Sequence, residues 1–187
     1  MTIEENFMDS ARKQFEYYKS LGEKTIDQLS EEELFWQFNE ESNSIAITVN
    51  HLWGNMLSRW TDFLTSDGEK EWRNRDLEFE SLIKTKSELL DKWNAGWKCL
   101  FDALDAVNKD NFDSEILIRN QRHTIIEAVN RQMMHYAYHI GQVVYVGRMI
   151  KGKDWQSLSI PKGKSTDYNA DKFSKGEHGG HFTDELK

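Results

Sequence analysis

The chain has 187 residues, enough for one domain with a hydrophobic core and too few for two domains of ordinary size. Its formal net charge is −8 and its basic residues are scattered, which argues against a nucleic-acid partner, because such proteins cluster Lys and Arg to neutralise phosphates. No apolar stretch approaches membrane-spanning length, and the N-terminus has neither a basic segment nor an apolar run. We therefore expect a cytoplasmic protein with no signal peptide and no membrane partner.

The first helix is expected to open at Thr2, because Thr2 and Glu5 match a capping box. Apolar residues then recur at steps of three and four as far as Leu29, which is typical of an amphipathic helix. A second capping box that begins at Ser30 predicts a short helix through Phe38.

A second long helix is predicted over residues 44–64, where apolar residues share one face. The stretch 69–80 is highly charged and irregular, and a third long helix is predicted over residues 80–107. This helix contains the lone cysteine, Cys99, which excludes an intramolecular disulfide and a multi-cysteine metal site. Its apolar neighbours favour a small buried hydrophobe over a nucleophile.

Residues 116–118 are prone to form a β-strand and are interpreted as one arm of a small ribbon. A third capping box at Thr124 predicts the start of a fourth long helix. This helix is expected to run to about Ile150, with Gly152 as its C-terminal stop.

Four long helices with one apolar face each predict an all-α protein, built as a four-helix bundle over residues 1–155. The single proline, Pro161, follows the last periodic segment, so nothing interrupts these helices. Residues 162–187 are rich in Gly, Ser, Lys and Asp. We expect residues 156–187 to form a short irregular extension, either wrapped on the bundle or partly disordered.

Two histidines in the fourth helix, His135 and His139, are four residues apart. Residues at this spacing share one face of an α-helix, so both imidazoles can reach one point beside it, which is a recurrent way to hold a transition metal. His51, in the second long helix, is a third candidate ligand. Three neutral ligands leave an ion its full charge and at least one open position, as in catalytic rather than structural sites.

The alternative is that these are ordinary surface histidines. His51 falls on a polar stripe of its helix, and His135 and His139 lie on a flank of theirs. A metal site requires the two polar stripes to face each other across an open end of the bundle, which periodicity does not show.

The remaining histidines are interpreted without a metal. His123 precedes the fourth helix and is expected in a loop. His178 and His181 could chelate an ion weakly, but a solvated tail accounts for them better.

Asn50-His51-Leu52 and the segment from His135 to Gln142 resemble the signature of the DinB-like (YfiT-like) superfamily, and the resemblance covers about residues 1–150. The segments 58–69 and 158–163 look like an uncharacterised branch of it. The resemblance implies a four-helix bundle that is often a homodimer. The association of the superfamily with DNA damage concerns the expression of its members and does not imply that they bind DNA.

The resemblance also implies a divalent metal held by three histidines, which by position are His51, His135 and His139. Zn and Ni are the first candidates, and three imidazoles also suit Fe or Cu. Members with an assigned activity often transfer or isomerise a small-molecule substrate with a low-molecular-weight thiol. Many others are described as metal-dependent hydrolases by resemblance alone.

A divalent ion with three neutral ligands lowers the pKa of a bound thiol or water. Amide hydrolysis usually also needs a nearby carboxylate to move protons. The sequence has no His-Glu-x-x-His, Glu127 lies about 12 Å along the helix from His135, and Asp62 is three turns beyond His51. Thiol activation for S-transfer therefore fits slightly better than hydrolysis, and a metal-binding module without catalysis remains a third hypothesis.

Overall fold

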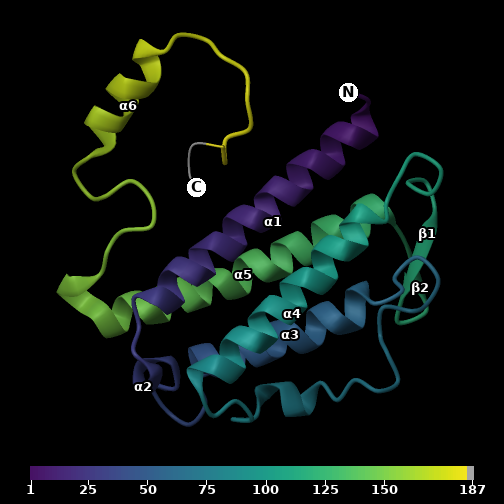
Figure 1. Cartoon of the computed structure of the whole chain (residues 1–187), viewed down its shortest axis with the longest axis horizontal. Helices are drawn as coiled ribbons and strands as arrows, with labels where there is room; N and C mark the ends of the chain where they lie inside the picture. The colour runs from purple at the N-terminus through teal and green to yellow at the C-terminus, as the bar shows by residue number, and fades with distance from the viewer. Residues whose placement is uncertain (185–187) are drawn as a thin grey trace.

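The structure is a computed structural model that describes residues 1–184. Four long helices form its body (Figure 1): α1 (Ile3–Asp27), α3 (Ile45–Trp60), α4 (Lys86–Asp105) and α5 (Ile125–Lys151). They confirm the all-α class. No helix in the described range is both long and apolar enough to cross a membrane.

The four helices pack in a ring, in which α3 lies between α4 and α5, and α1 contacts the same two helices from the opposite side. In Figure 1, α1 and α5 run in one direction, and α3 and α4 run in the other. Because α3 and α4 are parallel, the chain between them must travel back along the bundle. Residues 61–85 do this, and we call them the return segment. It includes the 3₁₀ turn η1 (Asp76–Phe79), which packs on α3.

Capping residues set most helix ends where the sequence indicates them. The capping boxes at Thr2, Ser30 and Thr124 are all formed. Gly152 ends α5 with a positive φ of 54°, a conformation that L side chains rarely adopt.

Several predicted boundaries were wrong. The short helix α2 (Glu31–Leu34) ends before Phe38, and α3 ends at Trp60 rather than near residue 64, because Thr61 is extended. The third long helix begins at Lys86, capped by Thr85, and not near residue 80, where the chain is still part of the return segment.

The predicted ribbon is a two-stranded antiparallel hairpin of β1 (Glu115–Ile118) and β2 (Gln121–Thr124). Its two-residue turn places Arg119 and Asn120 at φ values of 54° and 59°. The carboxylate of Asp67, in the return segment, accepts the backbone N–H groups of both turn residues at 2.8 and 2.7 Å. The return segment therefore holds the hairpin against the end of the bundle.

The core is rich in aromatic side chains, as the composition suggests. Tyr136 is fully buried, and its ring lies 5.9 Å from that of Phe15 and 6.0 Å from that of Trp97. Its hydroxyl accepts a hydrogen bond from Trp60 Nε1 at 2.9 Å and donates to Asn55 Oδ1 at 3.1 Å. This chain of hydrogen bonds connects the core to the polar face of α3.

The C-terminal extension contains a helix that was not predicted, α6 (Ser165–Ser174), which has no buried residue. Beyond it the chain returns to α1, where His181 Nε2 lies 3.0 Å from Ser10 Oγ and Thr183 is fully buried. The division of the chain at residue 155 stays a prediction.

Candidate metal centre

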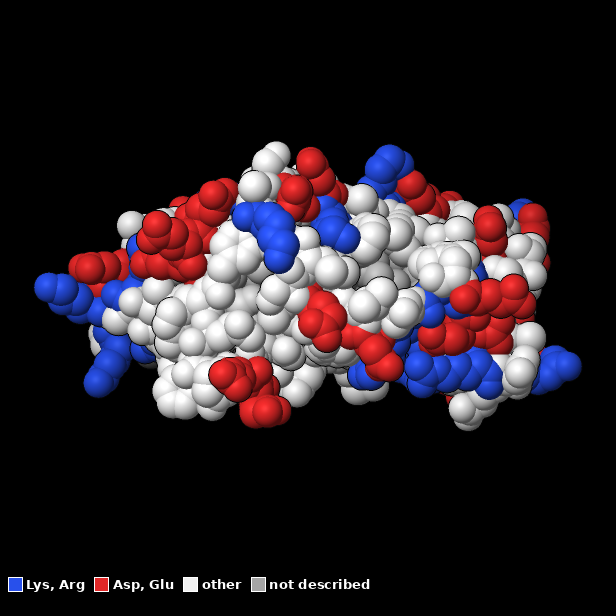
Figure 2. All heavy atoms as spheres, turned by 90° about the horizontal axis from the view of Figure 1, so that it is seen from below, with Lys and Arg blue, Asp and Glu red and all other residues white. Residues whose placement is uncertain are grey.

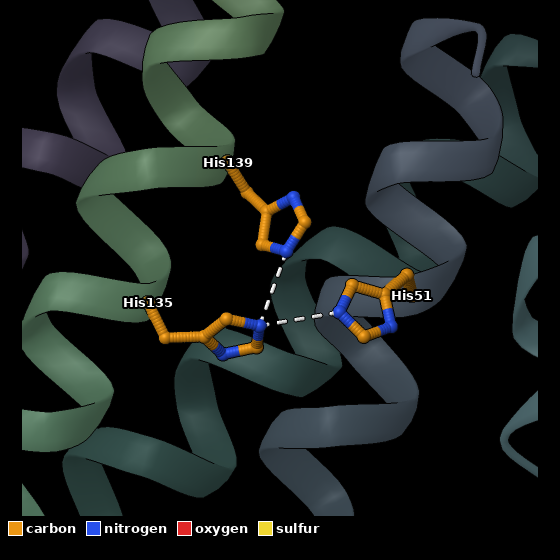
Figure 3. A group of neighbouring side chains, drawn as sticks. All are labelled: His51, His135 and His139. Carbon is orange, nitrogen blue, oxygen red and sulfur yellow. Dashed lines mark hydrogen bonds between the residues drawn. The ribbon is translucent and has the colours of Figure 1, made fainter. Parts of the chain in front are cut away.

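The three candidate ligands come together between α3 and α5. His51 points from the middle of α3 toward His135 and His139, which are one turn apart on α5 (Figure 3). His135 Nε2 lies 3.3 Å from His51 Nε2 and 3.1 Å from His139 Nε2. Within residues 1–184 this is the one group of three side chains whose ligand atoms, all within 4.8 Å of one another, could hold an ion.

These distances fit a first-row divalent metal. An imidazole nitrogen lies about 2.0–2.1 Å from Zn²⁺ in a tetrahedral site, so two such nitrogens are about 3.3 Å apart. The two Nε2–Nε2 distances from His135, 3.3 and 3.1 Å, agree with that value.

The other ring nitrogens of two of the ligands are hydrogen-bonded. His51 Nδ1 donates to Glu78 Oε2 at 2.8 Å, and His139 Nδ1 donates to Gln142 Oε1 at 2.8 Å. A carboxylate can only accept, so the proton of neutral His51 must be on Nδ1 and its Nε2 must present a lone pair. Gln142 Oε1 imposes the same tautomer on His139. Such partners fix the tautomer and the ring orientation of metal-ligating histidines.

The tautomers create an electrostatic problem that a cation would solve. The Nε2 atoms of His51 and His139 both offer lone pairs to His135 Nε2, which can carry at most one proton. At least one of the two short N···N contacts therefore opposes two lone pairs. A divalent ion at their centre would turn this repulsion into coordination.

Protonation of the rings does not remove this repulsion between lone pairs at neutral pH. Burial, followed by the proximity of His139 and His51, lowers the pKa of His135 from 6.5 to about 3. Burial and the nearby His51 lower the pKa of His139 to about 4. Both rings are therefore neutral near pH 7 and have the lone pairs that metal binding requires.

Glu78 is held firmly by its surroundings. Arg73 donates to both carboxylate oxygens, from Nε to Oε1 at 2.7 Å and from Nη2 to Oε2 at 2.9 Å. Asn50, the residue before His51, donates from Nδ2 to the backbone carbonyl of Glu78 at 3.0 Å. Burial by itself raises the pKa of Glu78, but the hydrogen bonds from His51 and Arg73 outweigh it and lower that pKa. Glu78 is therefore an ionised partner for His51.

The polar stripe of α3 is not a solvent face. Thr48, His51, Asn55 and Ser58 are all buried, because the return segment and α5 cover them. His139 is buried and His135 is half-buried. The alternative that these are surface histidines is therefore wrong, and the two polar stripes face each other as a metal site requires.

The other histidines lie elsewhere. His123 belongs to β2 and not to a loop, and its Nε2 accepts a hydrogen bond from Arg131 at 3.2 Å. His181 contacts Ser10 on α1, and His178 is exposed in the extension. None of them belongs to the three-histidine group.

Sequence reasoning missed the residues that support the ligands. Glu78 and Arg73 lie in the stretch considered irregular, where no periodicity distinguishes Glu78 from the other acidic residues nearby. One signal was available in Gly54, in the interior of α3 and one turn after His51. A Cβ on Gly54 would lie 2.5 Å from Glu78 Oε1, so the glycine permits this carboxylate to approach the helix.

A family model described as "Protein of unknown function (DUF1572)" matches residues 2–164, which include all three histidines, the return segment and the hairpin. No curated protein and no solved structure matches the chain significantly. Because the matched region covers most of the sequence, the chain belongs to the DUF1572 family.

Proposed function

We propose that this protein is a metal-dependent enzyme of the DinB-like (YfiT-like) superfamily that activates a low-molecular-weight thiol for S-transfer. The observation that carries the proposal is the convergence of three imidazole Nε2 atoms whose lone pairs cannot all be satisfied by protons. The matched DUF1572 region, which contains the motifs that resemble the superfamily, is consistent with it.

The proposed ion is Zn²⁺ or Ni²⁺, held by His51, His135 and His139. When bound, it supplies a Lewis acid with its charge uncompensated by its ligands, which lowers the pKa of a thiol or water. Glu78 and Gln142 orient His51 and His139. His51 and His135 also line a cavity of about 210 Å³, which gives a small molecule access to the site.

The carboxylates near the site favour thiol activation over hydrolysis. Both oxygens of Glu78 are occupied by His51 and Arg73, so this group is not available as a proton acceptor. No Asp or Glu is among the described residues that line the cavity. Hydrolysis of a stable amide usually needs such a base, whereas a thiol that has lost its proton is already a nucleophile.

Elemental analysis of the purified protein tests the metal site. We expect one equivalent of a transition metal in the wild type and a sharp loss in His135→Ala, His139→Ala and His51→Ala proteins. His178→Ala is the matched control, because His178 lies outside the group, and its metal content should be unchanged. Full metal retention in any one of the three site variants would remove that residue from the site.

Spectroscopy of the cobalt-substituted protein then separates the chemistries. Addition of a small thiol should produce intense sulfur-to-cobalt absorption, and the His139→Ala protein should show no such change. A spectrum indifferent to thiols, together with metal-dependent ester hydrolysis, would favour a hydrolase. If the metal is fully loaded and neither chemistry is detected, a non-catalytic metal-binding module is the better description.

A further inference from the structure

The cavity beside the three histidines has a composition unlike the rest of the chain. Its lining contains His51, His135, Asn55, Gln132 and five arginines: Arg59, Arg73, Arg75, Arg119 and Arg131. The chain as a whole has a net charge of −8, and on the face shown in Figure 2 acidic and basic side chains are interspersed between uncharged areas. Five arginines around one small cavity therefore require an explanation.

The arginines come from every element that surrounds the cavity. Arg59 lies two turns after His51 on α3, and Arg131 lies one turn before His135 on α5. Residues at these spacings share one helix face, so Arg59 lies on the same face of α3 as His51, and Arg131 lies on the same face of α5 as His135. Both arginines are nearer the hairpin than the histidines are. Arg119 comes from the hairpin turn, and the return segment supplies the other two.

The carboxylates within reach do not balance this charge. Glu69 Oε2 is shared by Arg59, Arg73 and Arg119, at 3.1, 3.2 and 3.0 Å. Glu78 is the second acidic partner and pairs with Arg73. Among residues 1–184 the five guanidinium groups form ion pairs with these two carboxylates alone, which leaves an excess of three positive charges.

Two of the arginines have no carboxylate partner among residues 1–184. The guanidinium carbon of Arg75 lies 5.1 Å from the centre of the Phe79 ring, which is itself stacked on His51 at 4.6 Å. Arg131 donates a hydrogen bond to the imidazole of His123. Both contacts hold the guanidinium groups beside the cavity and leave their charge uncompensated.

The cavity also contains buried polar atoms without a partner in the described range. Arg59 Nε and Gln132 Oε1 are buried and make no hydrogen bond, although both side chains line the cavity. A buried polar atom without a partner is costly, so each points to a polar ligand or to ordered water.

We infer that this cavity binds the anionic group of a small organic molecule, a carboxylate or a phosphate, whose reactive end lies at the three histidines. Arginine presents a planar fork of donors that matches such oxyanions and keeps its charge at any physiological pH. The cavity volume of about 210 Å³ suits a small charged group.

This inference rests on the proposed function, because it assigns the cavity to the molecule that meets the metal. Its test is nevertheless separate, since binding of an anion and content of metal are measured independently. Succinate, inorganic phosphate and the uncharged 1,4-butanediol are titrated into the protein by calorimetry, and metal is measured in the same preparations. Succinate and butanediol share a four-carbon chain, so their difference isolates the charge.

We expect succinate or phosphate to bind and butanediol not to bind, with affinity that weakens as ionic strength rises. Arg75→Gln and Arg131→Gln should each weaken anion binding by about tenfold, because each removes a charge-assisted hydrogen bond. Both residues are exposed, so the variants should fold. Arg131 binds His123 and Arg75 lies over Phe79, so neither side chain is hydrogen-bonded to a histidine of the metal site in the described range. Their metal content should equal that of the wild type.

Arg122→Gln is the matched control. Arg122 lies next to His123 on the same strand, pairs with Glu115 across the hairpin and does not line the cavity. Its anion affinity should stay within about twofold of the wild type. Preference for succinate would identify a carboxylate ligand, and preference for phosphate would identify a phosphoryl ligand.

Two results would overturn the inference. One is the absence of anion binding in a protein that is fully loaded with metal, which leaves the proposed function intact. The other is anion binding that Arg75→Gln and Arg131→Gln do not change, which would place the anion elsewhere. Anion binding of the expected kind in a protein that holds no metal would instead count against the proposed function alone.

Discussion

The substitution Gly54→Ala tests whether the position of Glu78 controls the metal centre. The new Cβ would lie 2.5 Å from Glu78 Oε1 and 2.8 Å from Cδ, and ordinary contacts begin near 3.4 Å. The carboxyl group would therefore have to move away from α3 by most of an ångström. Its hydrogen bond to His51 Nδ1, now 2.8 Å, would be stretched beyond a useful length.

The effect on stability combines two opposing terms. Alanine is about 1 kcal/mol more favourable than glycine inside a helix. Loss of a buried hydrogen bond to a charged group costs about 1.5–3 kcal/mol. We therefore expect the free energy of unfolding of the metal-free protein to fall by about 0.5–2 kcal/mol, measured by urea denaturation.

The effect on metal binding should be larger. Loss of a residue that orients a metal-ligating histidine typically lowers metal affinity by about 10–100-fold. Competition with a chromophoric chelator measures this affinity directly in wild-type and Gly54→Ala proteins. The measurement separates an orienting role of Glu78 from a purely structural one, because a structural role changes stability and leaves the affinity of the folded protein unchanged.

Gly141→Ala is the control for the gain in helix stability that any replacement of glycine by alanine brings. Gly141 is also inside a helix and lies two residues after His139, but a Cβ there would meet no atom within 4 Å. This variant should gain up to about 1 kcal/mol in stability and keep its metal affinity. If Gly54→Ala binds metal as tightly as Gly141→Ala does, the reasoning that connects Gly54, Glu78 and His51 is refuted.

Two further predictions concern other parts of the molecule. Burial raises the pKa of the Cys99 thiol, so its alkylation by iodoacetamide at pH 8 should be slower than that of free cysteine and should accelerate at higher pH; a rate equal to that of free cysteine would contradict the burial. We also expect a homodimer, because α5 exposes a stripe of large apolar side chains, Met134, Tyr138, Tyr145 and Met149, and such surfaces usually mark interfaces. Tyr145→Glu should shift the dimer to monomer in sedimentation, and a wild-type monomer at micromolar concentration would argue against it.

The long helices could be predicted from the sequence because their signals are local. A capping box involves residues three apart, and both Thr2 and Thr124 form one. The pairing of His135 with His139 is local for the same reason, since the helix itself brings the two rings together. The contact of His51 with this pair depends on how α3 packs on α5, and no pattern within either helix specifies it.

The residues that support the metal ligands were harder to predict from the sequence. The position of Glu78 depends on its contacts with Asn50 and His51, which are 28 and 27 residues away along the chain. The η1 turn is short, and its sequence contains no periodic apolar pattern that would predict it. The charged composition of the return segment was therefore interpreted as irregular, although Glu69, Arg73 and Glu78 pair with one another and with α3.

The polar stripe of α3 connects the metal ligand His51 with the return segment. A polar stripe on a helix indicates contact with water or with other polar groups, and periodicity cannot distinguish the two. Here three polar side chains of α3 have partners in the return segment: Asn50 binds the carbonyl of Glu78, His51 binds its carboxylate, and Ser58 donates to Gly68 O at 2.8 Å. A segment that is held by the same helix face as a metal ligand positions that ligand in turn. The return segment is therefore a structural part of the metal centre, and substitutions that detach it should weaken metal binding even where they touch none of the three histidines.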